Sequence, residues 1–499
     1  MMRAKRLLAA TLLVPSLALA PACSRVENPA TGEAEYTTLS PEQERQIGEQ
    51  EHPRILQQFG GAHPDEELQS YIEQIGDRIA AQSDLPETEF TFTVLNSEVP
   101  NAFALPGGYV YVTRGLLALA ETEAEVAGVL GHEIGHVTAR HTAQRQTRAT
   151  GAGLLATLGT LGAAIFGGEV AGRLAQEVAG VGAQAYLASY SRDQEYQADD
   201  LGVGYMTAAG YDPQAMASFL EKLDAQSQLE RPGGTDPAES WFATHPRTLD
   251  RVQRAAADAK AATGEELRVG RADYLARIDG LIYGEDPSQG MVRGRRFVHP
   301  ELGFAFEAPQ GFRLRNTPQA VLGQDEAGRL MIFTGADLAG GSPADYVAAP
   351  GLQQLARALR VEVSRPRNVE SFEVDGLPAA SASAAVRQDG READVGLAAI
   401  EAGETDYQFI FVSPGQMSGA EARAYQATVD SFERLSAQQA AAFAPQRIAV
   451  VPVEAGASAE ALARRMAVDE APLRRFEILN ALALRDGLAA GEQVKLIVE

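Results

Sequence analysis

Cysteine is almost absent from this chain, because Cys23 is the only one among 499 residues. No disulfide can form within the chain, so its fold must rest on packing and hydrogen bonds. Positive charge is also in deficit: 43 Lys and Arg residues face 67 Asp and Glu residues, and the net charge is −24. Such a charge repels a phosphate backbone and argues against a nucleic-acid-binding protein. It also argues against a basic patch for an anionic membrane surface.

The chain is too long for a single hydrophobic core, and its composition is that of a globular protein, with 45% hydrophobic and 22% charged residues. A chain of this length predicts about two to four domains. After Tyr283 we find no 34-residue helical repeat, which excludes a tetratricopeptide array there.

The first 22 residues form a signal peptide: a positively charged start, an apolar run at residues 7–19 and Ala20-Pro21-Ala22 before Cys23. A Cys at the first mature position resembles the acylated cysteine of bacterial lipoproteins, although Ala20 stands where their motif usually has Leu. Ser24 at the next position favours the outer membrane. Ordinary cleavage that leaves a free thiol is the alternative. The polar, turn-rich residues 23–40 are predicted to be a tether.

The most informative stretch is residues 126–140, VAGVLGHEIGHVTAR, which contains the H-E-x-x-H pattern. On a helix, His132 and His136 lie one above the other on the same face, so both can bind one metal ion. Glu133 lies further round the helix, where it can act as the general base for a metal-activated water. The alternative is a core helix with two hydrogen-bonded histidines.

Local signals support this helix. Thr122 followed by Glu125 is a capping box at its start. Gly128, Gly131 and Gly135 are costly inside a helix, so we expect close packing of this face against another element.

A second stretch, residues 184–202, offers a third ligand. Glu195 and Asp199 are four residues apart and share a helix face. Glu195 can bind the metal through a carboxylate oxygen, and Asp199 can accept a hydrogen bond from the outer nitrogen of a ligating histidine. The alternative for Glu195 is a solvated acid beside Arg192.

Three extended runs precede the metal helix, at residues 90–94, 101–105 and 109–113, and a Pro-Gly-Gly turn joins the last two. An edge strand next to the site could bind an extended peptide by adding it to the sheet. We assign this role to Asn101, Ala102, Phe103 and Ala104; a strand that only fills the core is the alternative. Residues 149–168 carry no charge and are interpreted as a small-residue helix hairpin near the site, or as a membrane span.

Four motifs occur in a fixed order: Asn101-Ala102-Phe103-Ala104 with Pro-Gly-Gly, His132-Glu133-x-x-His136, Ser191-Arg192-x-x-Glu195-x-x-x-Asp199, and His245-Pro246-x-x-x-x-Arg251. Together they resemble the zinc metalloprotease family of the CAAX prenyl proteases and HtpX (peptidase family M forty-eight), in its periplasmic BepA-like branch. The resemblance implies a mainly α, zincin-type (gluzincin) protease domain with a small β-sheet at residues 41–285.

The resemblance also implies the site. One Zn²⁺ per chain is bound by His132, His136 and Glu195, and Glu133 is the catalytic base. His245 and Arg251 match the family's residues that stabilise the tetrahedral intermediate. In the BepA-like branch the histidine that matches His245 can instead cap the zinc and keep the enzyme latent.

The C-terminal half has a different sequence pattern. Residues 295–436 have the pattern of an α+β domain that resembles PsbP, and we find no group of potential catalytic or metal-binding residues in them. Residues 437–446 are a linker. Residues 447–499 are expected to fold as a small βααβ module that resembles LysM, which would imply contact with peptidoglycan. Ala457-Ser458 replaces the usual Asp-Thr, so a module that serves only packing is the alternative.

The sequence therefore predicts a multidomain, zinc-dependent endopeptidase of the bacterial cell envelope that cleaves misfolded or unassembled proteins. We expect it in the periplasm, anchored to the outer membrane by a lipid on Cys23. The alternative is a mostly latent protease that acts as a periplasmic chaperone or envelope adaptor.

Overall fold

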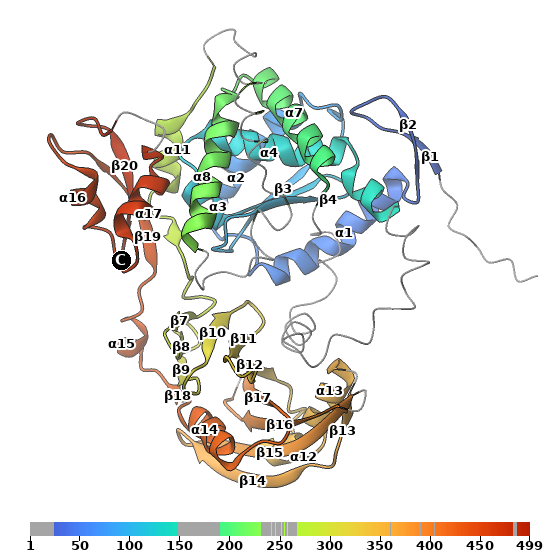
Figure 1. Ribbon diagram of the computed structural model, residues 1–499, viewed down its shortest axis with the longest axis vertical. Coiled ribbons are helices and arrows are strands. Elements are labelled where there is room, and N and C mark those ends of the chain that lie inside the picture. Colours follow the sequence, from blue (N-terminus) through green and yellow to red (C-terminus); the bar gives the residue numbers. More distant parts are fainter. Residues whose placement is uncertain are drawn as a thin grey trace, which may run out of the picture.

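The computed structural model describes residues 24–147, 190–230, 241, 245, 251, 254, 257, 267–359, 361–388, 391–403, 405–482 and 487–499. The signal peptide, Cys23 and the uncharged stretch at residues 149–168 lie outside this part of the chain. Figure 1 shows a body rich in helices, a β-rich body below it, and a C-terminal segment that returns to the first. We call the described residues within 24–283 and 446–499 the helical body, and those within 291–435 the β-rich body. Within the described ranges, no helix combines the length and apolar character that a membrane crossing requires.

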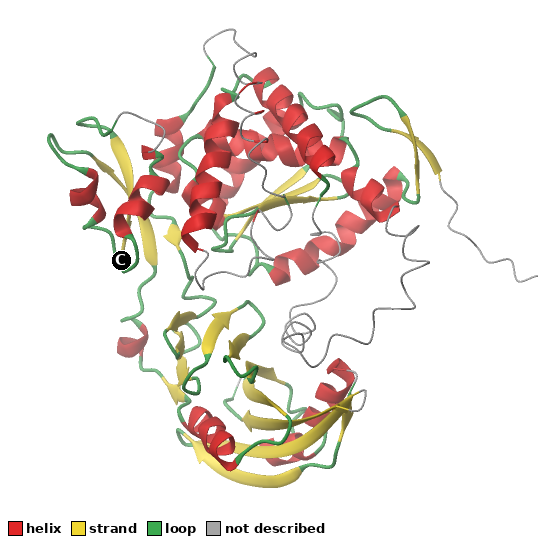
Figure 2. Cartoon of the chain, in the orientation of Figure 1, coloured by secondary structure: helices red, strands yellow, loops and turns green. Residues whose placement is uncertain are grey.

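A three-stranded sheet lies among the helices of the helical body (Figure 2). Its strand order is β3-β5-β4: β3 (Thr91–Leu95) runs parallel to β5 (Tyr109–Thr113), and β4 (Ala102–Leu105) is antiparallel to β5 at an edge. The predicted turn between β4 and β5 places Gly107 and Gly108 at φ angles of 85° and 89°, which glycine adopts without a Cβ clash. The helices are α1 (Pro41–Gln58), α2 (Glu66–Ala80), α3 (Arg114–Leu119), α4 (Glu123–Thr138), α7 (Arg192–Ala208), α8 (Gln214–Glu230) and α11 (Arg271–Ile278).

Helix α4 carries the H-E-x-x-H pattern and is buried at every residue except Val137. Thr122 caps it by accepting a hydrogen bond from the Glu125 N–H, which confirms one half of the predicted capping box. The Glu125 carboxylate accepts from the Glu121 N–H rather than from Thr122. Two of its glycines lie against α7: a Cβ on Gly131 would be 3.0 Å from the Gly202 carbonyl oxygen, and one on Gly135 would be 3.1 Å from that of Ala198. The third, Gly128, lies against Met216 of α8. The expected close packing is confirmed, since the two helix backbones are nearly in contact.

The predicted tether differs from the structure in its described part. Residues 24–37 form an antiparallel hairpin of β1 (Ser24–Glu27) and β2 (Ala34–Thr37). The hairpin is fixed to the end of α4, because buried Asn28 Nδ2 donates to the Ala139 carbonyl oxygen at 2.9 Å and Gln144 donates to Glu35 at 2.7 Å. These polar contacts order a segment that the sequence indicated would be free.

The β-rich body combines two sheets with three helices. Its eight-stranded sheet has the order β10-β11-β12-β17-β16-β15-β13, with β14 also paired to β15; a four-stranded sheet has the order β18-β9-β8-β7. The strands are β7 (Met291–Arg293), β8 (Arg296–His299), β9 (Phe304–Glu307), β10 (Arg313–Asn316), β11 (Val321–Gln324), β12 (Leu330–Ala336), β13 (Glu362–Val363), β14 (Arg367–Val374), β15 (Leu377–Gln388), β16 (Arg391–Ile400), β17 (Asp406–Pro414) and β18 (Glu433–Arg434). The helices are α12 (Pro343–Ala348), α13 (Pro350–Leu359) and α14 (Gly419–Asp430).

Alternation along the strands divides the apolar side chains of this body between two clusters. Leu330 and Ile332 of β12 belong to the cluster that includes α12 and α13, while Met331 and Phe333 belong to an aromatic cluster that includes α14. This period of two is what a sheet covered on both faces requires. The body is an α+β unit, as predicted from its short strands and helices.

The C-terminal segment has the predicted order of strand, helix, helix and strand. Its elements are β19 (Gln446–Pro452), α16 (Ala459–Ala463), α17 (Pro472–Leu479) and β20 (Gln493–Val498), and the predicted linker before it contains α15 (Ala437–Ala440). The segment is part of the helical body, however. Its sheet is extended by β6 (Ile282–Tyr283), and Phe476 and Leu496 share one apolar cluster with Leu116 and Tyr274.

Candidate metal centre

Four buried side chains converge in the helical body. His132, His136, Glu195 and His245 each offer one ligand atom, and these atoms all lie within 4.8 Å of one another. His132 Nε2 is 3.0 Å from His136 Nε2 and 3.3 Å from His245 Nδ1. The structure thus brings together the three ligands expected from the sequence, and it places His245 among them.

The packing of two helices creates this cluster. His132 and His136 are one turn apart on α4, and Glu195 lies in the first turn of α7, after the Ser191 capping box. Because the glycine contact holds α4 and α7 together, Glu195 Oε1 lies 3.5 Å from His136 Nε2 and Oε2 lies 3.9 Å from His132 Nε2. The ligands therefore come from two rigid elements.

The donor set suits a zinc ion. Imidazole nitrogens and one carboxylate are ligands that Zn²⁺ prefers, and all four side chains are buried from water. Burial lowers the pKa of His136 well below its ordinary value, which favours the neutral imidazole that a metal requires. The residues present therefore fit such an ion.

Asp199 lies where it can orient His132, the arrangement proposed from the sequence. Its Oδ1 is 2.9 Å from His132 Nδ1, on the side of the ring away from the cluster. Burial alone would raise the pKa of Asp199, but hydrogen bonds from Arg251 and His132 lower it below its usual range. A permanent carboxylate at this atom directs the other ring nitrogen, Nε2, toward the cluster.

Arg251 contacts the carboxylates of the cluster. Its Nε and Nη2 donate to Asp199 at 2.8 and 2.7 Å, and its Nη1 forms an ion pair with Glu195. The side chain is only 3% exposed. This geometry favours a role in positioning the ligands over the contact with a reaction intermediate that the resemblance implied.

Glu133 is fully buried next to the ligands. Burial raises the pKa of its carboxyl group, although His245 and His132 oppose that effect. Its Oε1 lies 3.4 Å from His245 Nε2, and neither carboxylate oxygen has a hydrogen-bond partner among the described residues. Burial of this kind favours the protonated form, which suits a carboxyl group that takes up a proton during a reaction.

Three contacts of the site were not predicted from the sequence. His136 Nδ1 lies 2.8 Å from the Nδ1 atom of buried His141, whose Nε2 lies 3.0 Å from Gln197 Oε1. Tyr190 stacks on His136 with ring centres 3.8 Å apart, and Trp241 stacks on His245 at 4.1 Å. The position of His141, just after the metal helix, was the available signal; the aromatic residues gave none.

A cavity of about 520 Å³ adjoins the cluster. Its lining includes His136, the end of β4 with Ala104 and Leu105, the Pro-Gly-Gly turn and part of the N-terminal hairpin. Within the described part of the chain, β4 pairs with β5 on one side only, which makes it the edge strand of this sheet beside the cavity. Asn101 and the β4 residues Ala102, Phe103 and Ala104 are buried.

Comparison with known proteins finds relatives of the part of the chain that contains these residues. Residues 66–259 match the model of Peptidase family M48. The chain is 32% identical over 266 residues to a putative beta-barrel assembly-enhancing protease of Vibrio cholerae serotype O1, which covers 51% of this chain and 53% of that protein. It is 27% identical over 233 residues to the mitochondrial metalloendopeptidase OMA1 of Schizosaccharomyces pombe, covering 45% of this chain and 64% of that protein.

The chain spans about half the length of the first bacterial relatives that it matches. Among solved structures, a cyanobacterial PsbP from Synechocystis gives a TM-score of 0.24 at 14% identity, covering 30% of this chain and 98% of that one. The matched residues 66–259 contain the buried histidines and Glu195 described above. Over these residues, the chain is similar to peptidase family M48.

Proposed function

We propose that this protein is a zinc-dependent endopeptidase with one metal ion per chain. The observation that carries the proposal is the convergence of His132, His136 and Glu195 beside Glu133 in a peptidase-family domain. A bound zinc ion would polarise the scissile carbonyl and make water acidic enough to ionise near neutral pH.

Glu133 would move the proton. Its buried carboxylate accepts a proton from the water molecule that attacks the scissile carbonyl carbon, and later delivers that proton to the leaving amine nitrogen. The raised pKa of Glu133 suits both steps, because the group must take up and release a proton at the same pH. Asp199 would hold the ring of His132, and Arg251 would hold the carboxylates of Asp199 and Glu195.

Substrates would be extended polypeptide segments. Among the described residues, β4 pairs with β5 alone, and its end lines a cavity that reaches His136, where an extended segment could add to the sheet. Residues 101–104 would bind the substrate backbone at this edge. Misfolded or unassembled envelope proteins present such segments, and the name of the Vibrio relative refers to assembly of beta-barrels.

The test is Glu133→Gln in the full chain, with Glu73→Gln at an exposed position of α2 as the control. Glu133→Gln should retain one zinc ion and reduce cleavage of unfolded casein by about 10²- to 10⁴-fold. Glu73→Gln should cleave like the wild type, and a chelator should stop both active proteins. Undiminished cleavage by Glu133→Gln would refute the mechanism.

His245 favours a second candidate function, a mostly latent peptidase that acts as a chaperone or adaptor. Its Nδ1 lies 3.0 Å from Glu195 Oε1, so it can occupy the fourth position that water and substrate need. Burial alone would lower the pKa of His245, but Glu195 and Glu133 raise it above its ordinary value. A large gain in casein cleavage by His245→Ala would support latency, and a loss would support a direct catalytic role.

We also propose the cell envelope as the location, with the chain in the periplasm and a lipid anchor on Cys23 at the outer membrane. The support is the leader sequence of residues 1–22. We propose likewise that residues 295–436 form a PsbP-like domain and residues 447–499 a LysM-like module, and that the module contacts peptidoglycan. Cell fractionation of wild type and Cys23→Ser tests the anchor, and sedimentation with purified peptidoglycan tests the contact.

A further inference from the structure

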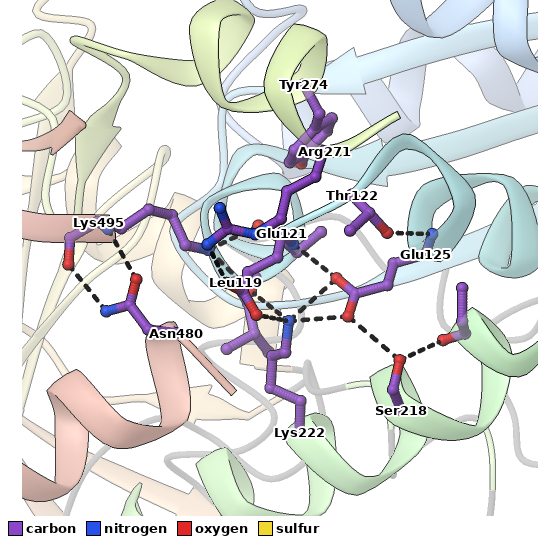
Figure 3. Close-up of polar contacts among 12 residues, drawn as sticks. Leu119, Glu121, Thr122, Glu125, Ser218, Lys222, Arg271, Tyr274, Asn480 and Lys495 are labelled. Atoms are coloured by element: carbon purple, nitrogen blue, oxygen red, sulfur yellow. Dashed lines mark hydrogen bonds and ion pairs between the residues drawn. The ribbon is translucent and has the colours of Figure 1, made fainter. Parts of the chain in front are cut away.

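The junction between α3 and α4 is held by a side chain from the far end of the chain. Helix α3 ends at Leu119, and Thr122 begins the cap of the metal helix α4. Carbonyl groups at the end of a helix lack partners within the helix and need other donors. Here the Lys495 ammonium donates to the carbonyl oxygens of Ala118, Leu119 and Ala120 at 2.8, 3.0 and 2.6 Å (Figure 3).

Lys495 is fully buried, in the middle of strand β20. Its own backbone is fixed by Asn480, whose side chain accepts from the Lys495 N–H at 2.7 Å and donates to its carbonyl at 2.9 Å. Burial lowers the pKa of Lys495 well below its ordinary value. Three acceptors nevertheless match the three N–H donors of an ammonium group, and the positive charge is favoured at the C-terminal end of a helix.

The chain uses lysine sparingly: four of its 43 Lys and Arg residues are lysines. Two of these four, Lys222 and Lys495, are buried together at this junction. The guanidinium group of an arginine is planar, so it could not direct three N–H donors from a single nitrogen atom toward three carbonyl oxygens. The choice of residue therefore follows the geometry of the junction.

A network of charges surrounds the same junction (Figure 3). Lys222 of α8 donates to both carboxylate oxygens of Glu125 at 2.9 and 3.0 Å, and Glu125 accepts from the Glu121 N–H at 2.6 Å. Arg271 of α11 bonds the Glu121 carboxylate at 2.9 Å and also the carbonyl of Gln493 at 2.8 Å. Strand β20 thus reaches the start of the metal helix at two points.

The metal helix is consequently fixed at two places. Its middle lies against α7 through Gly131 and Gly202. Its start is fixed by the junction, ten residues before His132, or about 15 Å along the axis. A rigid rod held at two places has a defined tilt, and the tilt sets where His132 and His136 point.

We propose that the C-terminal segment is a structural part of the peptidase, and that Lys495 is a positioning residue for the metal helix. The three carbonyl bonds of Lys495 hold the start of α4, and through it the two histidines. The metal-binding part of this inference rests on the proposed function. The segment would therefore not be a separable module, because its removal would free the end of the metal helix.

The test compares full-length wild type with Lys495→Met, which keeps the length of the side chain and removes the donors. Leu397→Ala, in the core of the β-rich body, is the control for lost stability. Lys495→Met should weaken zinc binding about tenfold, the low end for residues that orient metal ligands. It should also change the absorption bands of the cobalt-substituted protein and speed amide exchange in residues 122–132 of the metal-free protein. Leu397→Ala should change none of these.

Wild-type zinc affinity, cobalt spectrum and amide exchange in folded Lys495→Met would overturn the inference. If Lys495→Met does not fold, Arg271→Gln replaces it, since Arg271 is partly exposed and its loss removes only the second contact. Unchanged exchange at the start of α4 in that variant would also overturn it. If wild-type protein bound no zinc, the proposed function would fail, while amide exchange in the metal-free protein would still decide the role of Lys495.

Discussion

The contact between α4 and α7 makes Gly202 intolerant of a single added carbon atom. A Cβ at this position would lie 2.8 Å from the backbone nitrogen of His132, 3.0 Å from its Cα and 3.1 Å from the carbonyl carbon of Gly131. All three atoms belong to backbone, which cannot rotate away. We therefore expect Gly202→Ala to push the metal helix away from α7.

The size of the effect follows from these distances. Reaching an ordinary contact of 3.4 Å requires a shift of about 0.6 Å. Overpacking of this kind costs about 1–3 kcal/mol, against a gain of about 0.5–1 kcal/mol for alanine over glycine inside a helix. A metal site tolerates only about 0.2 Å in its bond lengths, so the zinc affinity should fall together with the stability.

Gly204 is the matched control, since it lies two residues further along the same helix and a Cβ there would meet nothing within 4 Å. Gly204→Ala should stabilise the helical body, and Gly202→Ala should destabilise it. Calorimetry measures both effects in the unfolding transition that zinc binding shifts to higher temperature. Each kcal/mol of stability should move the unfolding temperature by about 2–4 °C. Equal unfolding temperatures and equal zinc affinities for the two variants would refute the backbone contact.

Three further variants test other parts of the molecule. His141→Ala should weaken zinc binding about 10- to 100-fold, because the contact with His136 is lost; unchanged affinity in a chelator competition would contradict that role. Burial lowers the pKa of His299 from 6.5 to about 4, so between pH 6.5 and 4 the unfolded chain binds a proton that the folded chain does not. The β-rich body should therefore lose stability as the pH falls through this range, and a thermal unfolding series of His299→Gln should show a smaller slope; an identical slope would rule the assignment out. Phe333→Ala, in the aromatic cluster, should cost about 3–5 kcal/mol of that body's stability and leave zinc binding intact, whereas zinc loss would link the two bodies.

The helix that carries H-E-x-x-H could be predicted because its information is local. A cap at Thr122, two histidines one turn apart and glycines on the packing face are all properties of neighbouring residues. Glu195 could be predicted for a similar reason, since it shares a helix with Asp199 and that helix packs directly against α4. The antiparallel pairing of β4 with β5 could also be predicted from neighbouring residues, because the Pro-Gly-Gly turn between the two strands determines it.

Contacts between distant segments could not be predicted. The sequence alone does not distinguish an Arg251 that faces a substrate from one that faces the ligands, and the fold places it against Asp199 and Glu195. The N-terminal hairpin has a polar sequence, and its order comes from the bond between Asn28 and Ala139 over a separation of 111 residues. Lys495 looked like an ordinary charged residue in a strand, because its acceptors lie more than 370 residues away.

The pairing of β6 with β19 has a consequence for the architecture of the chain. Tyr283 and Gln446 are direct partners across these antiparallel strands, so the polypeptide leaves the helical body and re-enters it at neighbouring positions. The β-rich body is thus inserted into the helical body between two strands of one sheet. A turn of about two to five residues could replace residues 284–445. We expect the shortened chain to keep its metal site, and an unrelated domain with adjacent termini could be grafted at the same point.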